Sequence, residues 1–191
     1  MAGPPRLLMI VGAATPPGRL AAAVAFAAGN TADVAIENLN LAEVQVEICD
    51  GRPLDKYNDS TRRAVERIIG ADAVLIAAPV YRASYPGVLK NLLDIAPVEA
   101  LQAKPVGIVA MGGSPHHFLG VDWQLRAVLT WFGALVAPAS VYITGGDFKD
   151  GQLASDSARQ DLAALTATLA TLAKSLGGAA LGPKPLAAKF T

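Results

Sequence analysis

A strand–turn–helix unit in the middle of the chain constrains the fold most strongly. Residues 73–77 form an apolar run of strand length, and the apolar residues of 88–93 recur at helical spacing. We expect Pro79 to end the strand and Pro86 with Gly87 to begin the helix, where the missing N–H of a proline costs nothing. The turn between them carries two tyrosines, an arginine and a serine. Because ligands bind at the carboxyl ends of strands in open α/β sheets, this turn predicts a site for a planar, partly polar ligand.

Composition excludes several classes of protein. The 191 residues are 52% apolar and 17% charged, which suits one domain with a sheet covered on both faces and excludes a disordered chain. Basic and acidic residues balance at 16 each, which argues against a nucleic-acid or membrane-surface partner. No run approaches the roughly 18 apolar residues of a membrane span, and the single Cys49 fits a reducing cytoplasm. We expect one domain over residues 1–177 and a tail, 178–191, that is an arm or disordered.

Apolar runs alternate with helical patterns along the whole chain. We expect helices at residues 20–28, from a cap at 58–60 to 70, and at 87–95, 118–132 and 155–176. The run 44–48 also alternates, and the pattern leaves it open whether it is a strand or an extended loop. We expect strands at Arg6–Val11, Val34–Asn38, Ala73–Ala77, Val106–Ala110 and Leu135–Ile143. Five strands alternating with helices predict a three-layer α/β fold with a doubly wound parallel sheet.

The last helix carries one continuous apolar stripe of leucines. They recur every three or four residues, at Leu162, Leu165, Leu169, Leu172 and Leu176. We expect this stripe to pack on the sheet, with a seam between two copies of the chain as the alternative.

The turn after the first strand predicts a phosphate site. Phosphate binds at helix N-termini, where free N–H groups and the helix dipole favour an anion. Thr15 offers a hydroxyl, Gly18 allows close approach of the backbone, and Arg19 can pair with phosphate oxygens. The segment is not G-x-G-x-x-G and lacks a Walker lysine, so a dinucleotide-binding Rossmann site and a P-loop are not expected.

The segment from Pro79 to Asp94 resembles the flavin-contacting turn of the NAD(P)H-dependent FMN reductase family. That family's pattern is close to PxYxxSxPGxLKNxxD, and nine positions fit it: Pro79, Tyr81, Ser84, Pro86, Gly87, Leu89, Lys90, Asn91 and Asp94. Within the family, the chain is most similar to the sulfonate-type reductases, which supply reduced flavin to a partner monooxygenase. The resemblance implies the flavodoxin-like strand order 2-1-3-4-5 with residues 34–38 as the second strand, FMN and NAD(P)H as cofactors, and a homodimer or homotetramer.

In the first turn the sequence departs from the family pattern, which has Gly-Ser-x-Arg followed by one or two serines. Gly12 is kept, but Ala13 replaces the serine, Thr15 replaces the arginine, and Ala21 and Ala22 stand where serines are frequent. Two side-chain ligands of the phosphate are therefore missing, which favours weak, exchangeable flavin binding. The expected contacts of this turn are Gly12, Thr15, Pro17, Gly18, Arg19 and Leu20.

The resemblance assigns the other two turns to the flavin ring and ribityl chain. The side chain of Arg82 could contact flavin O2, contact a phosphate of the nicotinamide dinucleotide, or face solvent, and the sequence leaves these three alternatives open. The segment from Gly112 to His117 resembles the GGT-x-x-H loop of the sulfonate-type branch, and its glycines would let N–H groups approach the N1–C2=O2 edge of the flavin. The expected contacts are Pro79, Val80, Tyr81, Arg82 and Ser84 in the second turn, and Gly112, Gly113, Ser114 and His117 in the third.

The expected activity is hydride transfer from NAD(P)H to FMN, for which no catalytic side chain is required because the cofactor carries the chemistry. The alternative within this chemistry is a quinone, azo or metal-oxyanion reductase with resident FMN. The alternative from another class is a non-catalytic flavin-binding module. Ser114, His117 and Asp122 lie within nine residues without a G-x-S-x-G elbow, so a hydrolase triad is not expected. No ligand spacing indicates a metal site.

Overall fold

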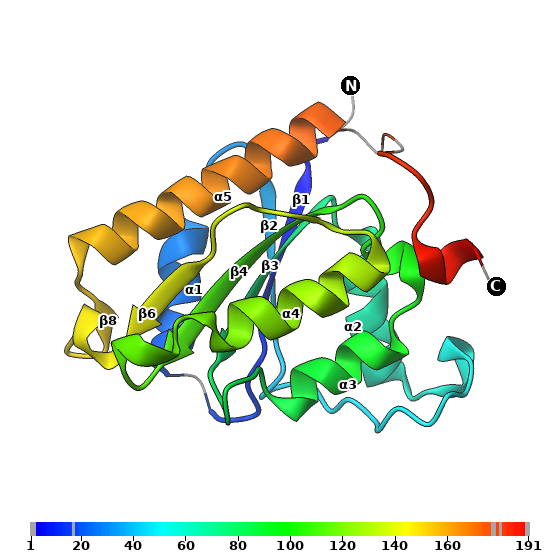
Figure 1. Cartoon of the computed structure of the whole chain (residues 1–191), viewed down its shortest axis with the longest axis horizontal. Helices are drawn as coiled ribbons and strands as arrows, with labels where there is room; N and C mark the ends of the chain where they lie inside the picture. Colours follow the sequence, from blue (N-terminus) through cyan, green and yellow to red (C-terminus); the bar gives the residue numbers. More distant parts are fainter. Residues whose placement is uncertain (1–2, 17, 177–178, 180, 190–191) are drawn as a thin grey trace.

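The computed structural model describes residues 3–16, 18–176, 179 and 181–189, and contains one parallel sheet between two helical layers (Figure 1). The strands lie in the order β2-β1-β3-β4-β5, with β6 also paired to β4. Their bounds are β1 Arg6–Val11, β2 Ala35–Asn40, β3 Ala73–Pro79, β4 Pro105–Gly112, β5 Leu135–Val136 and β6 Val141–Thr144. The fold class and the strand order expected from the sequence are confirmed.

Three helices cover one face of the sheet and two cover the other (Figure 1). α1 (Arg19–Gly29) and α5 (Asp156–Leu176) pack on one face, whereas α2 (Asp59–Gly70), α3 (Gly87–Ile95) and α4 (Leu119–Phe132) pack on the other. Side chains along β1 point alternately to the two faces of the sheet. Leu7 and Met9 face α1 and α5, while Leu8 and Ile10 face α2 and α3. Parallel strands buried on both faces are therefore apolar throughout.

The leucine stripe of α5 packs on the sheet, as expected. Leu162, Leu165 and Leu169 are buried. A Cβ on Gly107 of β4 would lie 3.0 Å from Leu169 Cδ1, so the glycine lets the helix approach the strand closely. Burying side chains of this kind stabilises the fold by about 1.5–3 kcal/mol each.

The prediction of a single outer strand at Leu135–Ile143 is wrong. The segment forms β5 and β6, separated by a loop that contains Pro138, which has no N–H to continue the ladder. Pro105 pairs with Leu135 and Val109 with Val141, so a step of four residues along β4 corresponds to six along its neighbour.

One side chain holds this break in place. Arg126 donates from Nη1 to the carbonyl of Ala137 (2.9 Å) and from Nη2 to that of Pro138 (3.2 Å). Its Nε also donates to both carboxylate oxygens of the buried Asp122, at 3.0 and 2.9 Å. The loop between β5 and β6 is thus tied to α4.

The structure also decides the state of residues 44–48, which the sequence left open, and adds features that were not expected. Residues 44–48 are an extended loop, and a small hairpin, β7 (Phe148–Lys149) with β8 (Gln152–Leu153), was not expected. β3 also includes Pro79, which pairs with Met111, because the ladder bond to Met111 O at this point comes from the N–H of Val80 (2.8 Å) and not from the proline.

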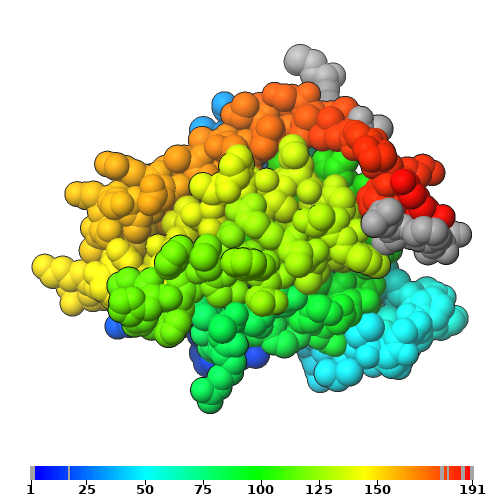
Figure 2. Space-filling model, viewed as in Figure 1, coloured from blue at the N-terminus to red at the C-terminus, as the bar shows by residue number. Residues whose placement is uncertain are grey.

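The described part of the tail lies beside the end of α4, shown in red in Figures 1 and 2. Gly133, at φ +70°, ends α4, and a Cβ there would lie 2.5 Å from Pro185 Cγ. Within the described residues, no helix is both long and apolar enough to cross a membrane.

Candidate functional site

The turns after β1 and β3 and the end of β4 meet at the carboxyl edge of the sheet, toward the bottom of Figure 1. They enclose a cleft of about 370 Å³. This is the switch point between β1 and β3, where the strand order reverses. The cleft is lined by Val11, Ala13, Thr15, Pro16, Gly18, Arg19, Leu20, Ala21, Pro79, Tyr81 and Met111. The cleft is therefore lined both by a helix N-terminus with a cation and by an aromatic ring with a thioether.

The start of α1 is open to an anion. The first turn begins at Gly12, whose N–H donates to Ala77 O (2.7 Å) and whose Cβ would lie 2.9 Å from Leu89 Cδ2. No side chain caps the helix and no acidic residue lies in its first turn. Its first hydrogen bond runs from Ala22 N–H to Gly18 O (2.9 Å), which leaves the three preceding N–H groups outside the helical ladder. These groups, with the hydroxyl of Thr15, suit a phosphate.

Arg19 lies against a fourth turn, which the sequence did not indicate. A Cβ on Gly145, directly after β6, would lie 3.0 Å from Arg19 Nη1. Asp147 fixes that turn, because its Oδ2 accepts from the N–H of Thr144 (2.7 Å) and from the Thr144 hydroxyl (3.1 Å). The absence of a side chain at Gly145 thus leaves room for the guanidinium at the phosphate end of the cleft.

The second turn is a strained two-residue hairpin. Tyr81 N–H donates to Ser84 O (2.7 Å) and Ser84 N–H to Tyr81 O (3.0 Å). The central residues, Arg82 (φ +50°) and Ala83 (φ +61°), both lie in the left-handed region that a type I′ turn requires. Such conformations cost of order 1–3 kcal/mol each for residues other than glycine. The turn places Tyr81 in the lining of the cleft and Arg82 outside it, exposed to solvent.

The third turn is held by a tyrosine from β6. A Cβ on Gly112 would lie 1.7 Å from Tyr142 Oη, so only glycine leaves room for this side chain. The Tyr142 hydroxyl donates to Ser114 O (2.6 Å), and burial raises the pKa of Tyr142 above its usual value. The hydroxyl therefore stays protonated as the donor that fixes the turn.

The structure brings six of the fifteen expected contacts into the lining of the cleft: Thr15, Gly18, Arg19, Leu20, Pro79 and Tyr81. Eight others belong to the three turns but do not line it: Gly12, Val80, Arg82, Ser84, Gly112, Gly113, Ser114 and His117. Pro17 lies outside the described residues. Val11, expected only as the last residue of the first strand, and Met111, which directly follows the expected fourth strand, also form part of the wall.

Three residues of the family pattern have contacts that explain them without a flavin. Asn91 donates from Nδ2 to Glu47 O (2.8 Å) and accepts from Cys49 N–H (2.8 Å), so its amide clasps the extended loop after β2. Lys90 and Asp94 form an ion pair one turn apart on α3. These three residues therefore stabilise α3 and its contact with the loop after β2, and they do not line the cleft.

A doubly wound sheet with an anion-binding helix start and an aromatic turn at its switch point defines a flavodoxin-like flavin-binding protein. Residues 5–149 match the family described as NADPH-dependent FMN reductase. The chain belongs to this family. The family expected from the sequence, its enzyme class, and FMN with NAD(P)H as cofactors are thereby confirmed.

Individual relatives agree with this assignment. The chain is 38% identical over 134 residues to an NAD(P)H-dependent FAD/FMN reductase of Geobacillus thermodenitrificans, covering 70% of this chain and 72% of that protein. It is 46% identical over 92 residues to the NADH-dependent FMN reductase SfnF of Pseudomonas fluorescens, covering 48% and 49%. The structure of an NADH:FMN oxidoreductase (EmoB, apo form) superposes with a TM-score of 0.76 at 26% identity, covering 97% of this chain and 99% of that one.

The residues of the cleft fit FMN. The free N–H groups of α1, the Thr15 hydroxyl and the Arg19 guanidinium form a donor set suited to its phosphate. Tyr81 and Met111 offer faces suited to its ring, and Pro79 closes the wall between them.

Proposed function

We propose that the protein is an NAD(P)H-dependent FMN reductase of the cytoplasm that uses flavin as an exchangeable substrate and supplies reduced FMN to a partner monooxygenase. The observation that carries this proposal is the composition of the phosphate end of the cleft. Ala13 and Ala21 line it, so two positions next to the phosphate offer methyl groups instead of hydroxyls. Each missing charge-assisted hydrogen bond weakens binding by about 1.5–3 kcal/mol, which favours release of the flavin.

The chemistry requires little from the side chains. Bound FMN supplies a ring that accepts a hydride from nicotinamide, without help from a side-chain acid or base. Arg19 and Thr15 would hold the phosphate, and Tyr81, which lines the cleft and is 47% exposed, would contact the ring. We propose that backbone N–H groups of the third turn, which Tyr142 holds in place, would approach the edge of the ring.

The decisive experiment is NAD(P)H oxidation by the purified protein with and without added FMN. Activity that needs added FMN and saturates with it supports an exchangeable substrate. A protein that purifies yellow, reduces quinones and ignores added FMN would instead hold its flavin permanently. Absence of oxidation under both conditions would overturn the enzyme proposal.

We further propose that the chain assembles as a homodimer or homotetramer through the outer face of α4. This face forms the front of the molecule in Figure 2 and has no other segment over it in that view. Leu119, Trp123 and Trp131 lie on it at spacings of four and eight residues and are 46%, 70% and 54% exposed. Large exposed apolar side chains at helical spacing are typical of an interface between copies.

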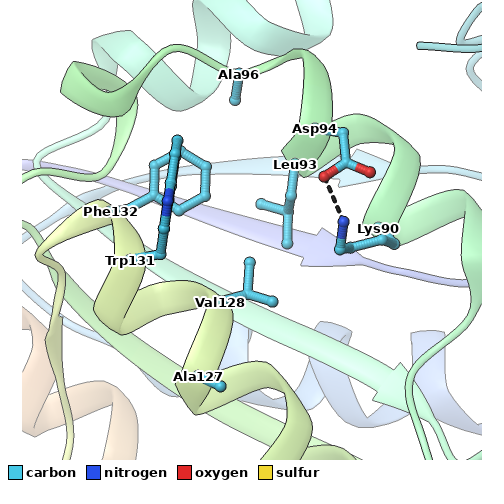
Figure 3. A pocket seen from close by; sticks show the side chains of 8 residues that line it. All are labelled: Lys90, Leu93, Asp94, Ala96, Ala127, Val128, Trp131 and Phe132. Carbon is cyan, nitrogen blue, oxygen red and sulfur yellow. Dashed lines mark hydrogen bonds and ion pairs between the residues drawn. The ribbon is translucent and has the colours of Figure 1, made fainter. Parts of the chain in front are cut away.

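A groove beside this face could receive such side chains. It lies between α3 and α4, has a volume of about 560 Å³, and is lined by Leu93, Val128 and Trp131 with the Lys90–Asp94 pair at its side (Figure 3). Light scattering after gel filtration tests the proposal. Trp123→Arg is expected to yield a monomer, whereas Ile48→Arg, which changes a similarly exposed apolar residue on the loop after β2, is expected to leave the assembly intact. A monomeric wild-type protein would contradict the proposal.

A further inference from the structure

Arg82 is a solvent-exposed cation next to the cleft that forms no ion pair among the described residues. It follows Tyr81, whose side chain lines the cleft, but it does not itself line the space assigned to FMN. Arg82 therefore stands at the rim, where a second ligand would approach the open side of the flavin.

The turn holds this cation in a fixed place. Two hydrogen bonds between Tyr81 and Ser84 close the turn. Val80 N–H continues the sheet ladder to Met111 O (2.8 Å). On the other side, Gly120 at the start of α4 packs against the turn, since a Cβ there would lie 3.2 Å from Val80 Cγ1 and 3.3 Å from the carbonyl carbon of Ala83. These contacts maintain left-handed conformations at two residues other than glycine, a form of strain that clusters at ligand sites.

The chemistry of the side chain indicates its ligand. A guanidinium presents a planar fork of N–H donors that matches the geometry of phosphate. Unlike an ammonium, it can donate two parallel hydrogen bonds to two oxygens of the same phosphate. Because acidic and basic residues balance over the whole chain, attraction of an anionic substrate depends on local cations. Arg19, which lines the cleft beside Gly145, meets this need at the FMN phosphate.

We propose that Arg82 binds a phosphate group of the nicotinamide dinucleotide and determines the affinity for this hydride donor. This inference rests on the proposed function as an FMN reductase. Two phosphate sources share the chemistry, the 2′-phosphate of NADPH and the pyrophosphate present in both dinucleotides. Kinetics with NADPH and with NADH distinguish them.

The test compares three variants with the wild type. Arg82→Asn removes the charge and keeps a residue that tolerates the left-handed conformation, Arg82→Lys keeps the charge without the fork, and Arg63→Ala removes an exposed arginine of α2 as the matched control. The readouts are KM for NADPH and NADH, and calorimetric binding of 2′,5′-ADP to the protein without flavin. Arg82→Asn is expected to raise KM for NADPH about tenfold, the loss of one charge-assisted hydrogen bond. Arg82→Lys is expected to lose less, and Arg63→Ala nothing.

The outcomes separate the two phosphates and the two proposals. An increase in KM for NADPH alone, with a parallel loss of 2′,5′-ADP affinity, assigns Arg82 to the 2′-phosphate. Equal increases for both dinucleotides assign it to the pyrophosphate. Unchanged KM for both, or weaker FMN binding in place of weaker donor binding, would overturn the inference. A wild type that binds 2′,5′-ADP but reduces no FMN would refute the proposed function and leave the phosphate site standing.

Discussion

The hydroxyl of Tyr142 occupies the space that a side chain at Gly112 would need, with only 1.7 Å between Oη and the position of a Cβ. The same hydroxyl donates to Ser114 O two residues further along (2.6 Å). β6 and the third turn are therefore interlocked, and the two residues depend on each other.

Gly112→Ala is expected to lower the free energy of unfolding by about 3 kcal/mol, since it combines overpacking with the loss of the partly buried hydrogen bond from Tyr142 to Ser114. Tyr142→Phe alone is expected to cost about 1 kcal/mol. Because the phenylalanine removes the nearest atom, the double variant is expected to lose less than the sum of both, measured by urea denaturation as a double-mutant cycle. Gly113→Ala, where a Cβ meets nothing within 4 Å, is the control. Strictly additive losses would refute the interlock.

Ala21→Ser restores a hydroxyl to the phosphate end of the cleft. One added charge-assisted hydrogen bond of about 1.5 kcal/mol is expected to tighten FMN binding roughly tenfold, measured by quenching of flavin fluorescence. Ala22→Ser is the matched control, because Ala22 neighbours Ala21 on α1 but does not line the cleft. Equal effects of both substitutions would show that the cleft does not hold the phosphate as proposed.

Ala83→Gly relieves the strain of the second turn. Because Ala83 has φ +61°, replacing it by glycine is expected to raise the free energy of unfolding by about 1 kcal/mol. The control is Ala139→Gly in the loop between β5 and β6, where φ is not positive and the substitution is expected to destabilise by about 0.5 kcal/mol. A loss of stability in both variants would contradict the claim that the backbone of Ala83 is strained.

Lys104 makes folding stability depend on pH. Its Nζ donates to the carbonyls of Ile68 (2.8 Å) and Ile69 (2.6 Å) at the end of α2, and burial lowers the pKa of Lys104 from 10.5 to about 8. Between these two pH values the unfolded chain keeps a proton that the folded chain has lost, so this group makes the free energy of unfolding rise with pH.

Lys104→Met removes this contribution. The difference in unfolding free energy between wild type and Lys104→Met is expected to be constant below about pH 8 and to move in favour of the wild type up to pH 10.5. Lys149→Met, which changes an exposed lysine of β7, is expected to show no such trend. A constant difference over the whole range would contradict the lowered pKa.

Local patterns in the sequence predicted most of the fold. β1 has the expected bounds because its apolar run is flanked by a proline and a glycine, and α2 begins after Asn58, whose side chain accepts from Thr61 N–H (2.7 Å). The break between β5 and β6 was missed because apolar residues alternate on both sides of Pro138, and the contacts of Arg126 that hold the break come from a distant helix.

Site residues that belong to one short turn were predicted from the sequence, and those whose position depends on contacts between distant segments were missed. Thr15, Arg19 and Tyr81 could be found from their turns. Met111 follows the expected fourth strand and no pattern marked it as a contact, and the contact of Gly145 with Arg19 joins residues far apart in sequence. Asn91 fits the family pattern, but only the structure shows that it clasps a loop instead of facing the cleft.

The interrupted outer strand also affects how the folded protein behaves in concentrated solution. An edge strand with a continuous row of unpaired N–H and C=O groups is a template for a strand of another molecule, and this leads to aggregation. Here the outer position is divided into two-residue β5 and four-residue β6, out of step by two residues and separated by a proline. An incoming strand cannot pair with both pieces in one register, so the same kink that Arg126 holds in place protects this side of the sheet against unwanted extension.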